Sequence, residues 1–149
     1  MPTIRPATEG DLAAILAIYN DAVMKTTAIW NEAPSDLAGR QAWFTTRRQA
    51  GFPVLVADEG KVLGYGSFGE FRPFDGYRMT VEHSLYVLDE AQGRGIGRML
   101  LAALIEGDDK LRMERSGERM RKTRELAAWP LFTGEDVPGD DTSTVARCL

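Results

Sequence analysis

The stretch Gln92-Gly93-Arg94-Gly95-Ile96-Gly97 decides the organisation of this chain. It follows the apolar run Ser84-Leu85-Tyr86-Val87 and opens an amphipathic segment from Ile96 to Leu104. A glycine-rich turn between a strand and a helix exposes backbone N–H groups at the positive end of the helix dipole. Glycine lets a ligand come close to the backbone, because it has no side chain to block the way. The stretch therefore predicts a strand, a phosphate-binding turn and a helix.

The spacing of the glycines separates this turn from two common phosphate loops. A dinucleotide fingerprint needs G-x-G-x-x-G, and Arg98 stands where the third glycine should be. The Walker pattern G-x-x-x-x-G-K-[ST] is absent from the chain. The pattern that fits is Q/R-x-x-G-x-G/A, filled by Gln92, Gly95 and Gly97, which resembles the pyrophosphate loop of the GNAT acetyltransferases. A glycine-rich turn without a ligand is the alternative.

Length, composition and charge limit the possible classes of protein. The chain has 149 residues, of which 44% are hydrophobic, enough for one domain with a packed core. A net charge of −4 argues against general nucleic-acid binding. Cys148 is the single cysteine and His83 the single histidine, which excludes an internal disulfide and argues against a Cys/His zinc site. No leader pattern or long apolar run is present, so we expect a cytoplasmic protein with no membrane contact.

Hydrophobic periodicity predicts a mixed α/β fold. Thr8 and Asp11 form an expected helix cap before a helix over residues 12–23, and Ser35 or Asp36 is expected to cap a second helix. The remaining predicted elements are strands over residues 3–5, 53–57, 61–68 and 79–87 and a helix over 96–104. The order β-α-α-β-β-β-α places antiparallel strands before the phosphate turn.

Five further motifs extend the resemblance to the first part of the chain. They are Ile18–Val23, Thr27–Asn31, Arg40–Phe44, Phe71–Phe74 and Thr80–Ser84. From residue 2 to about residue 106 the chain is similar to GNAT N-acetyltransferases, and within them to the phosphinothricin/methionine-sulfone acetyltransferase subfamily. The resemblance implies a GNAT mixed sheet with flanking helices, a central fourth strand with a parallel fifth strand beside it, and acetyl-CoA as co-substrate.

The resemblance ends after Glu106. Lys110 to Arg124 carries seven basic and two acidic residues. The longest apolar run in residues 107–149 is short, Leu126–Trp129, and Pro130 ends it, so we expect no buried central strand there. We therefore divide the chain into a GNAT part over residues 1–106 and an aberrant tail, partly helical or disordered, over 107–149. In this interpretation the C-terminal half of the fold is missing or replaced. A frameshift, a recombined end, a truncated product and a divergent but genuine C-terminal half remain alternatives.

Amine acetylation requires the amine to lose a proton, the thioester carbonyl to be polarised and the thiolate to gain a proton. The resemblance implies that Glu82 is the base, directly or through a water, and a strand carboxylate that faces solvent is the alternative. His83 points to the opposite face by strand alternation, and we interpret it as structural rather than as a proton carrier. The family's thiolate acid and cofactor-side asparagine would fall in the unmatched part, so neither is assigned.

The resemblance also implies backbone contacts to the thioester and pantetheine arm along the strand, and to the pyrophosphate in the turn. The expected cofactor-binding residues are Leu85, Tyr86, Val87, Gln92, Gly93, Arg94, Gly95, Ile96, Gly97 and Arg98. Arg94 and Arg98 add positive charge where phosphates bind, although exposed arginines near a turn can be merely solvated.

For the acceptor, Trp30 and Phe74 are aromatic residues next to polar loops that suit an apolar amino-acid side chain, or else ordinary core residues. Arg72 and Arg78 are expected to pair with a substrate carboxylate. The leading hypothesis is an N-acetyltransferase that acts on a small amino-acid-like amine such as phosphinothricin, methionine sulfone or methionine sulfoximine, working as a homodimer. The alternatives are a catalytically impaired remnant, a non-catalytic acyl-CoA-binding module, and a basic arm for an acidic partner.

Overall fold

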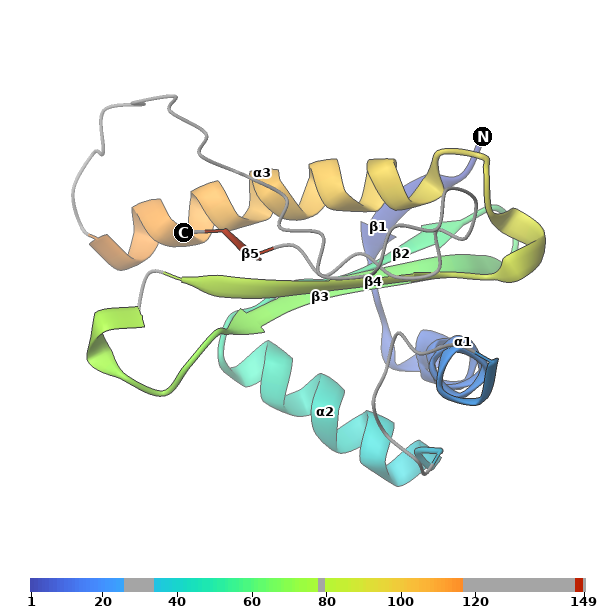
Figure 1. Cartoon of the computed structure of the whole chain (residues 1–149), viewed down its shortest axis with the longest axis horizontal. Helices are drawn as coiled ribbons and strands as arrows, with labels where there is room; N and C mark the ends of the chain where they lie inside the picture. The colour runs from blue at the N-terminus through green and yellow to red at the C-terminus, as the bar shows by residue number, and fades with distance from the viewer. Residues whose placement is uncertain (26–33, 78–79, 117–146, 149) are drawn as a thin grey trace.

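A computed structural model describes residues 1–25, 34–77, 80–116 and 147–148, with the backbone alone for 108–116 and 147–148. One antiparallel sheet lies at its centre, in the order β1-β2-β3-β4-β5. The strands are β1 (Thr3–Pro6), β2 (Val54–Asp58), β3 (Val62–Glu70), β4 (Val81–Val87) and β5 (Arg147–Cys148). Helix α3 covers one face of the sheet, and α1 and α2 cover the other (Figure 1). The mixed α/β fold predicted from the sequence is confirmed.

The strand next to β4 differs from the one that the resemblance implies. In the described residues β4 pairs beyond β3 only with β5, which is two residues long and antiparallel rather than parallel. The pairing joins Val81 to Cys148 and Glu82 to Arg147. A segment without a sustained apolar run cannot bury a central strand, whereas two residues suffice to pair with the beginning of an edge.

Local capping fixes the start of the helices on the face covered by α1 and α2, the lower face in Figure 1. The Thr8 backbone N–H donates to Asp11 Oδ2 at 2.7 Å, which fixes the short helix η1 (Glu9–Asp11) and leads into α1 (Leu12–Lys25). Asp36, not Ser35, caps α2 (Leu37–Gln49), because its carboxylate accepts from the Gly39 N–H at 2.7 Å. The choice that the sequence left open is thereby decided.

Helix α3 (Ile96–Ser116) is longer than predicted and runs through Gly107 without a break. Residues 110–116 are mostly good helix formers, so one glycine does not end the helix. The helix therefore includes the first part of the basic segment Lys110 to Arg124, and residues 117–146 lie outside the described residues.

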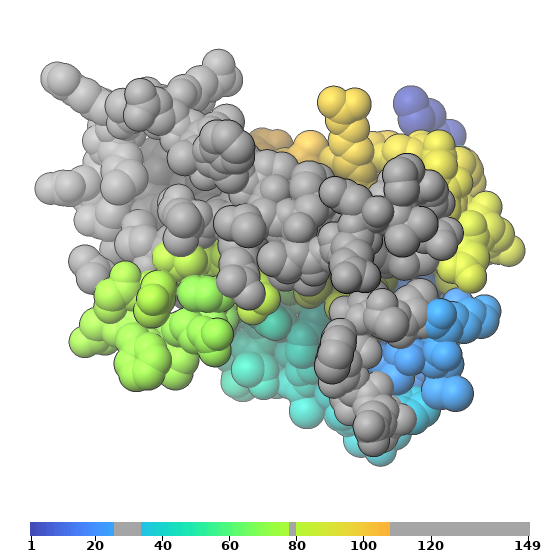
Figure 2. Space-filling model, in the orientation of Figure 1, coloured from blue at the N-terminus to red at the C-terminus, as the bar shows by residue number. Residues whose placement is uncertain are grey.

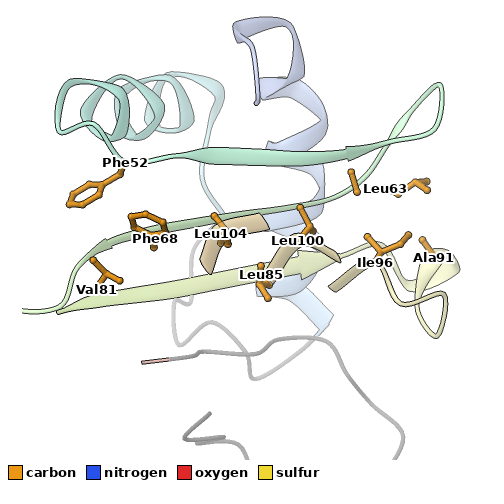
Figure 3. Packing of buried hydrophobic residues seen from close by; sticks show 10 residues of the cluster. Phe52, Leu63, Phe68, Val81, Leu85, Ala91, Ile96, Leu100 and Leu104 are labelled. Carbon is orange, nitrogen blue, oxygen red and sulfur yellow. The ribbon is translucent and has the colours of Figure 1, made fainter. Parts of the chain in front are cut away.

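The core divides into two apolar clusters, one on each face of the sheet. Figure 3 shows the cluster beneath α3, where Ile96, Leu100 and Leu104 point toward the side chains of Leu85 and Phe68 on the sheet. These three α3 residues are at most 1% exposed. The second cluster joins α1 and α2 to the sheet, with Ile15, Ile18, Phe44, Val56 and Tyr65 at its centre.

Candidate active site

Strand alternation divides the residues of β4 between the two faces of the sheet. Glu82 and Tyr86 lie on the face covered by α1 and α2, whereas His83 lies on the α3 face. The His83 side chain is completely buried, and its ring meets Phe68 edge-on at a centroid distance of 5.4 Å. This packing supports the structural interpretation of His83, while the half-buried Glu82 stays available as the candidate base.

Arg47 of α2 reaches the sheet beside Glu82. Glu82 pairs across the sheet with Gly69, and a Cβ atom at Gly69 would lie 1.4 Å from Arg47 Nη1. The glycine thus leaves the space that the guanidinium occupies. Burial holds the pKa of Arg47 below its usual value, the nearby charge of Arg40 lowers it further, and Glu82 opposes the decrease.

Aromatic rings surround the second arginine, Arg40. Its Cζ atom lies 3.9 Å from the ring centroid of Tyr19 and 4.7 Å from that of Trp43, both cation–π distances. The rings of Tyr65 and Tyr86 lie nearby on the sheet, with centroids 5.2 Å apart and an angle of 36° between their planes. Burial raises the pKa of both phenols, so each stays a neutral hydroxyl.

The glycine-rich turn has the geometry that a phosphate site needs. Gly93 and Gly95 adopt φ values of +73° and +78°, which favour glycine, and nothing approaches within 4 Å of a Cβ built at either position. Gly97 lies in the first turn of α3, and a Cβ there would come only as near as 4.0 Å to Val87 Cγ2. The open backbone at the helix N-terminus therefore fits the pyrophosphate of a coenzyme.

The two arginines of the turn do not both face open space: Arg94 already has a carboxylate partner, and Arg98 is exposed. Arg94 donates to both carboxylate oxygens of Glu59, at 3.0 and 2.7 Å, and Glu59 also pairs with the N-terminal amine of Met1 at 3.1 Å. Any phosphate that recruits Arg94 must compete with Glu59.

The last residues of β4 pair with a described strand on one side, that of β3. Leu85, Tyr86 and Val87 pair with β3, but in the described residues β5 pairs only with Val81 and Glu82. A small hollow lies next to this end of β4, between it and α1. It is lined by Ile18, Asp21, Ala22, Tyr86, Val87, Leu88 and Asp89. The hollow, of about 10 Å³, is too small for a pantetheine arm, so only the edge of β4 that no described strand covers fits the predicted contact.

The predicted acceptor residues are only partly described. Phe74 is 67% exposed beside the short helix η2 (Asp75–Tyr77), and the exposed Arg72 stacks on Phe71 with its Cζ atom 5.1 Å from the ring centroid. In Figure 2 this segment projects at the lower left edge of the molecule. Trp30 and Arg78 lie outside the described residues.

Arg40 and Arg47 were not among the predicted site residues, although a signal for them exists. Arg40, Trp43 and Arg47 follow a three- and four-residue spacing, which puts them on one side of a helix. Their position facing the sheet combines with Gly69, a glycine inside a strand, which often marks a close approach of another group.

Comparison with known proteins shows the family of the chain. The sequence model described as "Acetyltransferase (GNAT) family" matches residues 15–123. The L-methionine sulfoximine/L-methionine sulfone acetyltransferase of Pseudomonas aeruginosa is 62% identical over 106 residues, which cover 70% of this chain and 62% of that protein. The chain belongs to the GNAT acetyltransferase family.

Two solved structures share the fold. The Salmonella typhimurium protein yncA, solved with its cofactor acetyl-CoA, is 38% identical at a TM-score of 0.73, over 99% of this chain and 91% of that one. The GNAT phosphinothricin acetyltransferase of Sinorhizobium meliloti, in complex with acetyl-CoA, is also 38% identical, at a TM-score of 0.71, over 74% and 60%. Acetyl-CoA is the co-substrate of this family.

The chain is short beside its curated relatives. It spans about six tenths of the length of the Pseudomonas protein and of a similar Escherichia coli L-amino acid N-acyltransferase. In the part of the chain that the structure describes, no helix is long and apolar enough to cross a membrane.

Proposed function

We propose that this chain transfers an acetyl group from acetyl-CoA to the amine of a small amino-acid-like substrate of the phosphinothricin, methionine sulfone or methionine sulfoximine type. The observation that carries the proposal is the pairing of two features on adjoining segments. A glycine turn opens toward solvent at the N-terminus of α3, and a carboxylate, Glu82, lies on the strand that leads into that turn.

The turn, the end of β4 and Glu82 have separate roles in this proposal. Gly93, Gly95 and Gly97 hold the pyrophosphate with their backbone N–H groups, together with Gln92, Arg94, Ile96 and Arg98. The backbone of Leu85, Tyr86 and Val87 lies along the pantetheine arm. When bound, acetyl-CoA supplies an acetyl thioester that the amine attacks with loss of the thiol. Glu82 accepts the proton that the amine gives up, directly or through a water.

The acceptor residues remain predictions from the resemblance. Arg72 and Arg78 pair with the substrate carboxylate, and Trp30 and Phe74 contact its apolar part. The division into a GNAT part over residues 1–106 and a separate tail, and the homodimer, belong to the same proposal. Light scattering in solution measures the mass that tests the dimer.

Thiol release with acetyl-CoA and L-methionine sulfone tests the activity, and calorimetric titration with acetyl-CoA tests the cofactor site. Gly95→Val places a β-branched residue at a positive φ, which costs about 1–3 kcal/mol, and its side chain obstructs the phosphate. We expect the variant to bind acetyl-CoA roughly 10- to 100-fold more weakly. Gly51→Val is the matched control, since Gly51 has a φ of +76° but lies at the end of α2. Equal affinity in the parent and Gly95→Val would refute the pyrophosphate role.

A non-catalytic acyl-CoA-binding module is the second candidate, and one observation favours it. On the side of β4 that faces away from β3, the described residues supply only the two-residue β5. In that case calorimetry would detect binding of acetyl-CoA, and thiol release would stay at the rate measured without protein.

A further inference from the structure

The face of α2 that meets the sheet carries two positively charged side chains, Arg40 and Arg47. Arg40 and Arg47 are half-buried, and neither forms an ion pair in the described part of the chain. Charged side chains in such a position are normally paired, because removal of an ion from water is costly. Arg40 obtains partial compensation from the Tyr19 and Trp43 rings. The guanidinium of Arg47 lies over the backbone of Gly69, and its Cζ atom is 5.8 Å from the ring centroid of Trp43.

Two buried polar groups, one on Arg40 and one on Tyr65, lie in the same place. Arg40 Nε and the Tyr65 hydroxyl are buried, and neither forms a hydrogen bond of standard geometry within the described residues. The Arg40 side chain is the polar neighbour of the Tyr65 hydroxyl, and this loose contact leaves part of their hydrogen-bonding capacity open. Donors of two residues therefore accompany the unpaired positive charge.

Glu82 lies close to this arginine pair without neutralising it. The carboxylate influences Arg47 and Tyr86 electrostatically, but it forms no ion pair with Arg47. The site thus presents a negative group on β4 and, across Gly69, a positive pair on α2. An α-amino acid has the complementary arrangement, with its amine next to its carboxylate.

We propose that Arg40 and Arg47 form an oxyanion subsite that holds the α-carboxylate of the acceptor while its amine faces Glu82. The inference rests on the proposed function, but it gives the main part of carboxylate recognition to this pair instead of to Arg72 and Arg78. Arg72 is exposed, so an ion pair made there is screened by solvent, whereas Arg47 acts from a half-buried position. The enclosed pair therefore contributes more to recognition of the carboxylate than Arg72 does.

The test compares two acceptors, L-methionine sulfone and the amine obtained by its decarboxylation. The parent protein should use the sulfone roughly 10- to 100-fold better in kcat/KM, the range of a charge-assisted hydrogen bond. Arg47→Gln should abolish this preference by raising KM for the sulfone, with little effect on the decarboxylated amine. Arg72→Gln should keep most of the preference.

Matched variants separate recognition from folding. Arg48→Gln changes the next residue of α2, which points to Glu9 instead, and should leave the preference unchanged. Gly69→Ala displaces the Arg47 guanidinium while keeping its charge and should weaken the preference, so it tests the same placement if Arg47→Gln does not fold. Thermal melts followed by circular dichroism show which variants are folded.

Calorimetric binding of L-methionine sulfone distinguishes failure of this inference from failure of the proposed function. If the parent shows no thiol release but binds the sulfone, and Arg47→Gln weakens that binding, the subsite stands although acetyl transfer does not. Thiol release with no preference for the sulfone, or with an equal preference in Arg47→Gln, overturns the subsite and leaves the function intact. Absence of both binding and release overturns both.

Discussion

The two faces of the sheet are built on different principles. Under α3 the buried side chains are leucine, isoleucine, phenylalanine, valine and alanine. Among the described residues, the buried polar side chain on that face is His83. Under α1 and α2 the apolar cluster is bordered by tyrosines and by Arg40 and Arg47. The first face maximises apolar burial, and the second includes polar groups that cost stability unless a ligand or a neighbour satisfies them.

This difference teaches where the chemistry is located. Proteins accept unsatisfied polar groups mainly where they function, so the lower face, with Glu82, is the candidate reactive side. The α3 face fixes the helix whose N-terminus carries the phosphate turn. Substitutions on the two faces should therefore separate stability from activity.

The largest effect is expected from Glu82→Gln. This change keeps the shape of the side chain and deletes the proton acceptor, and a general base contributes roughly 10²- to 10⁴-fold in rate. Turnover in the thiol-release assay should fall by that factor, while calorimetric affinity for acetyl-CoA stays nearly constant.

Glu70→Gln is the control for this substitution. Glu70 ends β3, pairs with Val81 next to Glu82, and is exposed. Its variant should keep the rate of the parent, and an unchanged rate in Glu82→Gln would remove Glu82 from the mechanism.

On the other face, Leu100→Ala should mainly reduce stability. Leu100 is 0% exposed in the α3 cluster, and truncation of a buried leucine costs about 2–5 kcal/mol. The free energy of unfolding, measured in urea, should fall by that amount. The rate per folded molecule at low temperature should stay near that of the parent, and a proportional loss of rate would mean that the two faces are not separable.

The lower face should also respond to acid. Hydrogen bonds from Arg5, and further ones from Thr8, hold the pKa of Asp11 well below its usual value although burial opposes them. A lowered pKa means that this stabilisation is complete above the unfolded pKa of about 3.9 and is lost as the pH falls further. Asp11→Asn should lower the free energy of unfolding at neutral pH by about 1–2 kcal/mol.

Urea unfolding at a series of acidic pH values measures this contribution. The difference between the parent and Asp11→Asn should shrink below the unfolded pKa, because the parent then loses the same interaction. A difference that stays constant down to low pH would assign the effect to packing instead of charge.

The smallest expected effect belongs to Tyr65→Phe. The buried hydroxyl has no hydrogen bond of standard geometry in the described residues, and its polar neighbour is Arg40. Its removal therefore deletes a desolvated polar group at the cost of one loose contact. The variant should unfold at the same temperature as the parent or slightly higher, by up to about 1 kcal/mol in stability. A clear loss of stability would show that the hydroxyl is satisfied in the folded protein.

Local signals in the sequence were sufficient for most of the elements. The period-2 and period-3.6 patterns, the Thr8–Asp11 cap and the spacing Gln92, Gly95, Gly97 each depend on residues close together in the chain. They predicted β1 to β4, α1, α2 and the beginning of α3 within a few residues, but not β5. The end of α3 was missed, because helix propensity in residues 110–116 outweighed the glycine at 107.

Only the tertiary structure decided what surrounds Glu82. Strand alternation placed Glu82 and His83 on opposite faces, but the partners of Glu82 come from residues far away in the chain, Gly69 on β3 and Arg47 on α2. A charged residue on an amphipathic helix usually faces water, and nothing local says that Arg40 and Arg47 face the sheet. The sequence determined which segments form strands, helices and the phosphate turn, because these depend on local periodicity and backbone freedom. The packing of α2 on the sheet decided which charges meet, because the electrostatic environment of a residue depends on segments that folding brings together.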